Sequence, residues 1–160
     1  MSHSILERHR KIAPTETHDK ARSRDDGERV WRQAFQRARL AVEMATWRTA
    51  LTLLEECLRD RPDDADALGL YGLCLAREGH DLARAYEACR RAVESQPFEA
   101  AMHTSLGCVY LAMGMYPPAV SCFHTALRLD PHDAVAGRGL ASALHPQRHG
   151  GDLVRRLLDG

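Results

Sequence analysis

The chain has 160 residues, of which 44% are hydrophobic and 28% are charged. These fractions are typical of a globular protein, and the length is sufficient for one domain with a hydrophobic core. The 22 basic and 22 acidic residues balance to a formal net charge of zero. A nucleic-acid interface needs a net basic surface, so the composition argues against that class of function. Most of the basic residues are arginine, which suggests a GC-rich bacterial source.

The start of the chain and its cysteines indicate the cellular compartment in which the protein is expected. Residues 1–11 are polar and charged, and they lack the apolar core of a secretory signal. No stretch approaches the roughly 18 consecutive apolar residues of a membrane span, so we expect no membrane insertion. The five cysteines are odd in number and form no CxxC motif, as expected of reduced thiols. The sequence therefore predicts a cytoplasmic protein.

Residues 1–26 carry many charges and few large apolar side chains. Such a segment buries too little apolar surface to offset the entropy lost on ordering. We therefore expect a flexible N-terminal tail over residues 1–26, with at most a short helix. The predicted helical domain covers residues 27–145.

The first pair of helices is expected to begin after Asp26. Apolar residues recur there at spacings of three and four, which indicates a helix with one buried face. Thr46 is a candidate N-cap for a second helix, and Pro62 ends that helix.

Two further helix pairs are expected after Pro62. Gly79 and Gly114 end the first helix of each pair, where a left-handed residue is needed. Pro117 and Pro118 suit the first turn of a helix, where a missing amide proton costs nothing. A last helix over residues 134–145 has no partner of its own kind and is expected to cap the stack.

Residues 146–160 form the predicted C-terminal tail. It contains a glycine pair at residues 150–151, followed by one more short amphipathic turn. The apolar side chains of that turn are Leu153, Val154, Leu157 and Leu158.

A four-residue pattern that begins with proline and ends with alanine occurs three times. Its prolines are Pro62, Pro97 and Pro131, which lie 35 and 34 residues apart. A fixed period of this size indicates stacked units of secondary structure, here about residues 31–64, 65–99 and 100–133. Short helical arrays of this kind usually present a surface to another protein.

The third unit closely resembles the tetratricopeptide repeat. Small, aromatic and proline residues stand there at the signature spacings of that family, namely Leu106, Gly107, Tyr110, Gly114, Tyr116, Ala119, Phe123, Ala126 and Pro131. The second unit resembles the repeat with one extra residue near His80, and the first unit resembles it less closely. The resemblance covers about residues 31–131. It implies an all-α fold, a right-handed superhelix of stacked antiparallel helix pairs with a concave groove.

In this family the first helix of each pair lines the groove. By that resemblance the first unit would contribute Arg32, Phe35, Arg39 and Glu43. The second unit would contribute Asp66, Gly69, Leu70, Leu73 and Arg77, and the third Ala101, Thr104, Ser105, Cys108 and Leu111. Some members clamp a partner's C-terminal carboxylate with Lys, Arg and Asn. This chain lacks the Asn and Lys at those positions, so that clamp is not predicted.

The expected groove is apolar and small in its middle and at its far end, with charge toward the first unit. Such a floor suits an extended or helical peptide with apolar anchors. The alternative is that the groove is filled by the protein's own tail, residues 1–26 or 151–160. Cys108 is the cysteine expected to be exposed, whereas the other four are expected in the core.

No catalytic motif is present, since the sequence contains no phosphate-binding glycine loop, GxSxG or HExxH. The histidines and cysteines lack metal-ligand spacing, so neither a metal nor a cofactor is predicted. The favoured hypothesis is a non-catalytic adaptor or chaperone that holds a segment of a partner protein in its groove. The alternative is a structural subunit or homo-oligomer that packs through its convex face or terminal helices.

Overall fold

The computed structural model describes residues 16–145, and it describes side chains from residue 24 onward. Seven helices and no strands occur in this part of the chain. In chain order they are α1 (Glu16–Glu43), α2 (Trp47–Asp60), α3 (Ala65–Glu78), α4 (Leu82–Ser95), α5 (Ala100–Ala112), α6 (Tyr116–Leu129) and α7 (Ala134–Leu144).

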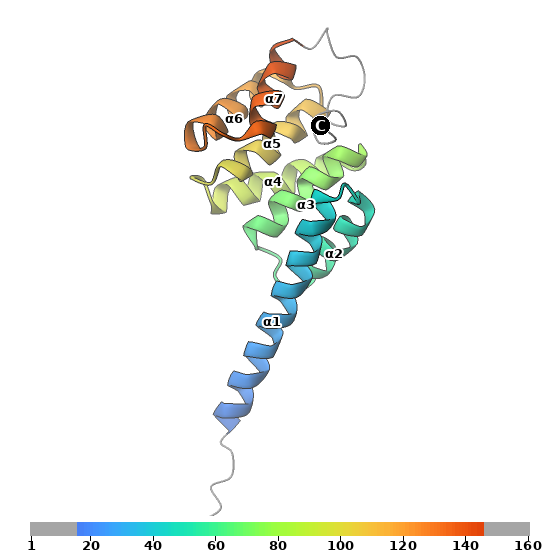
Figure 1. Ribbon diagram of the computed structural model, residues 1–160, viewed down its shortest axis with the longest axis vertical. Coiled ribbons are helices and arrows are strands. Elements are labelled where there is room, and N and C mark those ends of the chain that lie inside the picture. Colours follow the sequence, from blue (N-terminus) through green and yellow to red (C-terminus); the bar gives the residue numbers. More distant parts are fainter. Residues whose placement is uncertain (1–15, 146–160) are drawn as a thin grey trace, which may run out of the picture.

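The helices form three consecutive pairs, α1 with α2, α3 with α4 and α5 with α6, as Figure 1 shows. Each first helix also contacts the first helix of the next pair, because α1 packs on α3 and α3 on α5. Helix α7 continues this row, since it packs on both α5 and α6. The first helices therefore make one layer of the stack, and α2, α4 and α6 make the other.

Helix α1 begins earlier than the sequence predicts. The expected tail covers residues 1–26, whereas the helix already starts at Glu16 and projects beyond the stack (Figure 1). Its polar sequence shows little apolar periodicity, but neighbouring turns are joined by ion pairs. Arg29 contacts Asp26 at 2.7 Å, and Arg32 contacts Glu28 at 3.2 Å. Such pairs stabilise a solvated helix. The predicted tails over residues 1–15 and 146–160 lie outside the described residues.

Trp31 anchors α1 to α2. Its indole Nε1–H donates a hydrogen bond to the Cys57 carbonyl oxygen at 3.1 Å, and its ring stacks on Phe35 with centroids 5.2 Å apart. The Arg61 guanidinium lies 4.1 Å from the Trp31 ring centroid and also forms an ion pair with Glu28. These contacts hold the C-terminal half of α1 against the stack.

The proline-containing pattern places helix caps at two of its three occurrences. Asp64 accepts a hydrogen bond from the Ala67 amide at 2.9 Å, and Asp133 accepts one from the Ala136 amide at 2.8 Å. Each carboxylate satisfies an amide that has no partner within its own helix. Thr46 stands at the N-cap position of α2 without capping it, because its hydroxyl donates to the Ala41 carbonyl oxygen at 3.0 Å.

The turns within the pairs follow the expected chemistry. Gly79 and Gly114 have φ of 70° and 73°, the left-handed conformation expected at these helix ends. Pro117 and Pro118 stand in the first turn of α6. The turn between the helices of the second unit contains the extra residue, and Asp81 ends this turn. Its φ is 43°, and its carboxylate accepts a hydrogen bond from the Arg84 amide at 3.1 Å.

Small residues allow the helices to approach closely. A Cβ added at Gly72 of α3 would lie 2.3 Å from the Cys89 sulfur and 2.7 Å from the Ala85 carbonyl oxygen of α4. Phe123 of α6 is fully buried between two more glycines. A Cβ at Gly107 of α5 would come within 2.7 Å of its ring, and one at Gly139 of α7 within 2.4 Å. Phe123 is therefore the point where α5, α6 and α7 meet.

Candidate functional site

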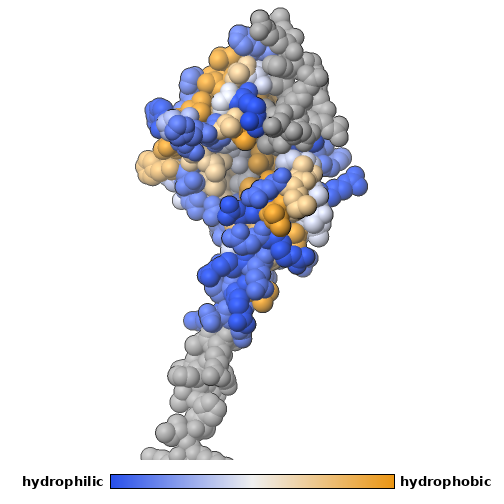
Figure 2. Space-filling view, viewed as in Figure 1, coloured by the Kyte–Doolittle hydropathy of each residue, from blue (hydrophilic) through white to orange (hydrophobic). Residues whose placement is uncertain are grey.

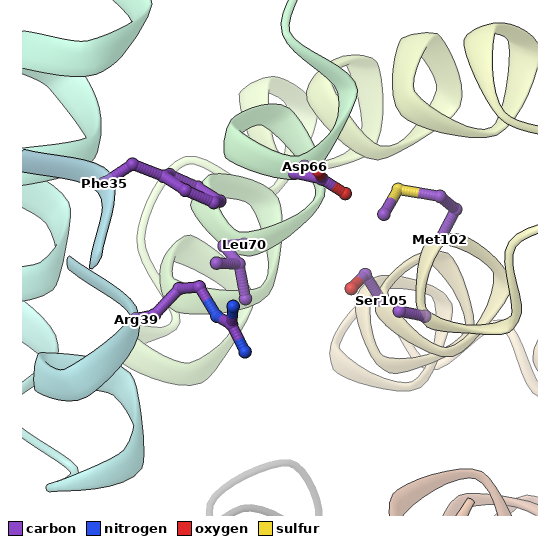
Figure 3. Close-up of a pocket in the computed structure, with 7 residues that line it drawn as sticks. Phe35, Arg39, Asp66, Leu70, Met102 and Ser105 are labelled. Atoms are coloured by element: carbon purple, nitrogen blue, oxygen red, sulfur yellow. The ribbon is translucent and has the colours of Figure 1, made fainter. Parts of the chain in front are cut away.

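The candidate site is a pocket between the first helices of the three pairs (Figure 3). It has a volume of about 350 Å³. Helices α1 and α3 each contribute two residues four positions apart, which places both on one face of the helix, and α5 contributes three. The lining residues are Phe35, Arg39, Asp66, Leu70, Ala101, Met102 and Ser105.

The floor of the pocket is apolar. Phe35 and Met102 are 8% and 4% exposed, and Leu70 is half-buried between them. Met102 reaches toward α3 because Gly69 has no side chain there, and a Cβ at Gly69 would lie 3.0 Å from the Met102 sulfur. The pocket therefore offers apolar contact to one bulky side chain.

Two opposite charges stand at the rim. Asp66 and Arg39 are both exposed, and they point to different sides of Leu70 in Figure 3. No ion pair joins them among the described residues. Burial raises the pKa of the Asp66 carboxyl, the neighbouring Asp64 raises it further, and Arg39 lowers it. A cationic group placed beside Asp66 would stabilise the charged form of this carboxylate further, because Asp66 forms no ion pair with Arg39.

Six of the predicted groove residues come together in this pocket, namely Phe35, Arg39, Asp66, Leu70, Ala101 and Ser105. Arg32 and Glu43 are exposed on α1 outside it. Leu73 is half-buried against the core cluster around Phe123. Arg77 is half-buried, with its guanidinium 5.2 Å from the centroid of the Trp47 ring.

The predicted far end of the groove is wrong. Thr104, Cys108 and Leu111 are only 6%, 0% and 4% exposed. The reason is that α7 packs on α5 as the first helix of a next unit would, and Asp133 accepts a hydrogen bond from the Thr104 hydroxyl at 2.6 Å. Residues that would face an open groove are therefore core residues at this end.

Met102 is the lining residue that the sequence prediction missed. It belongs to the buried side of α5, and it reaches the pocket only because Gly69 of α3 leaves space. The sequence contains one usable signal for this contact. A glycine at an expected groove position leaves a gap that a long side chain from the neighbouring helix can fill.

The packing of α7 on α5 has a second consequence, which is the burial of Cys108. Burial raises the pKa of the Cys108 thiol to about 12, and that of Cys74 likewise to about 12. Burial also raises the pKa of the half-buried Cys122 to about 11. The thiolate is the reactive form, so fully buried thiols with such pKa values are inert near neutral pH.

We expect the native protein to resist alkylation by iodoacetamide at pH 8, with Cys122 modified first and Cys108 only on unfolding. Mass spectrometry of peptides from native and guanidinium-unfolded samples measures the order. Raising the pH toward 11 should increase Cys122 modification first, because its thiol ionises at the lowest of the three stated pKa values. Rapid native modification of Cys108 would contradict the burial described above.

Neither a membrane span nor a metal-binding cluster is found in the described part of the chain. No helix between residues 16 and 145 is both long and apolar enough to cross a membrane. Over the described residues, no three His, Cys, Asp or Glu side chains gather as metal ligands would.

Stacked antiparallel helix pairs whose first helices line a common pocket define the chain as a helical-repeat protein. The profile described as "Tetratricopeptide repeat" matches residues 35–100. Human tetratricopeptide repeat protein 7A is 36% identical over 101 residues, which are 63% of this chain and 12% of that protein. The chain belongs to the tetratricopeptide repeat family, and it spans about an eighth of that relative.

Solved structures support the same fold. An O-GlcNAc transferase mutant from Thermobaculum terrenum matches with a TM-score of 0.67 and 30% identity, over 80% of this chain and 24% of that one. The first repeat domain of Spaghetti (RPAP3), bound to an HSP90 peptide, matches with a TM-score of 0.62 and 13% identity, over 74% and 94%. The fold is accordingly a tetratricopeptide repeat solenoid, the right-handed superhelix that the resemblance implies.

Proposed function

We propose that this chain is a non-catalytic interaction module, an adaptor or chaperone of the cytoplasm, that holds a segment of a partner protein in the pocket between α1, α3 and α5. The observation that carries the proposal is the pocket itself, with its apolar floor and opposite charges at its rim. The Spaghetti domain, which has the same fold, holds a peptide. A peptide with an apolar anchor fits the chemistry of this pocket.

The site suits binding more than catalysis. The pocket contains one carboxylate and one guanidinium, without a nucleophile and base in hydrogen-bonding contact among the described residues. The match covers only 24% of the length of the transferase, so it gives no support for a transferase activity in this chain. Family membership favours protein recognition, and the balanced net charge favours a protein partner over a nucleic acid.

The test of this function is a pair of matched substitutions. Ala101 and Ala83 are both exposed and are both the second residue of their helix, but Ala101 lines the pocket and Ala83 lies on α4 in the other layer. We expect Ala101→Arg to fill the pocket and abolish capture of the partner from a native lysate, whereas Ala83→Arg leaves capture unchanged. Quantitative mass spectrometry of tagged pull-downs measures both.

A partner that is captured equally by wild type, Ala101→Arg and Ala83→Arg would contradict the proposal. Circular dichroism of each variant should show unchanged helix content, because both positions are exposed.

A second candidate function is that of a subunit in a larger assembly or homo-oligomer. It is favoured by apolar side chains that α1 leaves exposed, with Val30, Leu40 and Met44 at 62%, 54% and 66%. Met44 lies four positions after Leu40 and fourteen after Val30, so the three side chains share one side of the helix. Figure 2 shows this helix as otherwise largely hydrophilic. A solution mass above 17.9 kDa that falls when Leu40 and Met44 become Glu would support this candidate.

A further inference from the structure

The pocket between α1, α3 and α5 contains a buried hydroxyl group without a partner. Thr104 and Ser105 are the buried polar residues in the described part of the chain. The Thr104 hydroxyl donates a hydrogen bond to Asp133, whereas the Ser105 hydroxyl has no hydrogen-bond partner among the described residues. Ser105 is 5% exposed, and Figure 3 shows its oxygen directed toward Leu70 and the pocket. Buried polar groups are nearly always hydrogen-bonded, so this hydroxyl is available to an occupant of the pocket.

The two charged residues at the rim are available in the same sense. Neither Arg39 nor Asp66 forms a hydrogen bond or an ion pair with another described residue. Away from the pocket, Arg61, Arg90 and Arg91 each pair with a carboxylate. An occupant that carries one acidic and one basic residue would therefore complement the charges of the rim.

The positions of Arg39 and Asp66 define how far apart those two residues stand. Figure 3 shows Phe35 and Asp66 toward one end of the pocket, and Arg39 and Leu70 toward the other. Neighbouring helices lie about 8–10 Å apart, and four residues of a helix rise about 6 Å. The diagonal from Arg39 to Asp66 across the apolar floor is thus roughly 10–12 Å. In an extended segment, residues four positions apart lie about 13 Å apart, and in a helix residues seven positions apart lie about 10 Å apart.

The Ser105 hydroxyl distinguishes between these two conformations. A helical segment satisfies most of its backbone carbonyl groups internally, whereas an extended segment leaves them free to accept a hydrogen bond. Alternate residues of an extended segment also point to the same side. An apolar residue and the residues two positions before and after it would therefore all face the pocket. The volume of about 350 Å³ is near the lower end of the range for ligand pockets, which suits one inserted side chain.

We propose that the partner segment binds in an extended conformation, with a bulky apolar residue on the floor of the pocket and a charged residue two positions to each side. One charged residue is acidic and lies beside Arg39, and the other is basic and lies beside Asp66. The Ser105 hydroxyl donates a hydrogen bond to a backbone carbonyl oxygen of the segment. This assignment rests on the proposed function and adds the chemistry of the partner.

The charge pattern can be measured with short synthetic peptides that are acetylated and amidated, so that their ends carry no charge. Each has a central phenylalanine, charged residues two positions to each side and alanine elsewhere. The set contains both orders of one glutamate and one lysine, a peptide with two glutamates and a peptide with two lysines. NMR titration of the full-length chain gives their dissociation constants. We expect a mixed peptide to bind about fivefold more tightly than either like-charged peptide.

Charge reversal in the protein should change this preference in a defined direction. Arg39→Glu should prefer the peptide with two lysines, and Asp66→Arg should prefer the peptide with two glutamates. Arg37→Glu and Asp60→Arg are the matched controls, because they change the net charge equally at exposed positions outside the pocket. Both controls should keep the preference of the wild type.

Two further comparisons test the conformation and the hydrogen bond. Peptides with the charges directly beside the phenylalanine, or at the spacing of a helix face, should bind more weakly than the best mixed peptide. Ser105→Ala should weaken binding of that peptide about threefold to tenfold, the usual range for one lost hydrogen bond. Ser95→Ala, at an exposed position in the last turn of α4, should leave binding unchanged.

Four results would overturn the assignment. They are no measurable binding of any peptide, equal affinities across the set, a preference that persists in both Arg39→Glu and Asp66→Arg, and tighter binding of the helix-spaced peptide. The outcome is separable from that of the proposed function. If the preferences are absent while Ala101→Arg still abolishes partner capture, the assigned chemistry fails and the binding function stands. If the preferences hold but Ala101→Arg leaves capture unchanged, the partner binds elsewhere and the proposed function fails.

Discussion

Phe123→Ala is expected to lower the free energy of unfolding by about 3–5 kcal/mol, the usual cost of removing a buried aromatic ring. The ring is fully buried, and glycines from α5 and α7 lie against it. Helices that meet on one ring through backbone contacts cannot move in to fill the space without losing their other contacts. Guanidinium unfolding followed by circular dichroism at 222 nm measures the change.

Phe98→Ala is the matched control, since the same atoms are removed from a side chain that is 84% exposed. The expected change there is within about 0.5 kcal/mol. Equal changes for the two variants would mean that α7 does not close the core around Phe123. Because α7 also buries Cys108, Phe123→Ala should make that thiol easier to alkylate under native conditions, whereas Phe98→Ala should not.

The features that could be predicted from the sequence are those determined by local chemistry. Gly79 and Gly114 take left-handed conformations because a helix end requires them, and Pro117 and Pro118 begin a helix because their missing amide protons cost nothing there. The repeat period then predicts how the pairs stack. Each of these inferences needs only neighbours in the sequence and the spacing of similar units.

The site could be predicted only in part, because part of it depends on contacts between distant segments. Phe35, Arg39, Asp66, Leu70, Ala101 and Ser105 follow from the face of each first helix. The burial of Cys108 depends on α7, which packs across α5 and is more than twenty residues away in the sequence. A helix assigned only to cover the end of the stack gives no indication that it also closes the groove.

The start of α1 was missed for a different reason. Hydrophobic periodicity detects helices that pack on a core, and residues 16–26 contain few large apolar residues from which such a periodicity could be recognised. Further along α1, ion pairs such as Arg29 with Asp26 each contribute only a few tenths of a kcal/mol, about 0.2–0.5. The C-terminal half of α1, which begins near Trp31, packs on the stack. It stabilises the earlier turns because a helix that has already formed is extended at little cost.

Gly72→Ala is expected to destabilise the protein by about 1–3 kcal/mol, although alanine is the better helix former. The added Cβ would meet the Cys89 sulfur and the Ala85 carbonyl oxygen. The sulfur belongs to a side chain, but the oxygen belongs to the backbone of α4. Helix α4 must therefore move away from α3, and every contact between the two helices weakens together.

Gly137→Ala makes the same chemical change in a helix where nothing lies within 4 Å of the new atom. There the substitution only lowers the conformational entropy of the unfolded chain and improves the helix propensity. We therefore expect the free energy of unfolding to increase by about 0.5–1 kcal/mol. The two variants should thus change the unfolding free energy with opposite signs in the same denaturation experiment. Changes of the same sign would mean that α3 and α4 are not held at the separation that Gly72 permits. A loss for Gly72→Ala that Cys89→Ala fully relieves would locate the clash at the sulfur alone, whereas partial relief would show that the backbone of α4 sets the limit.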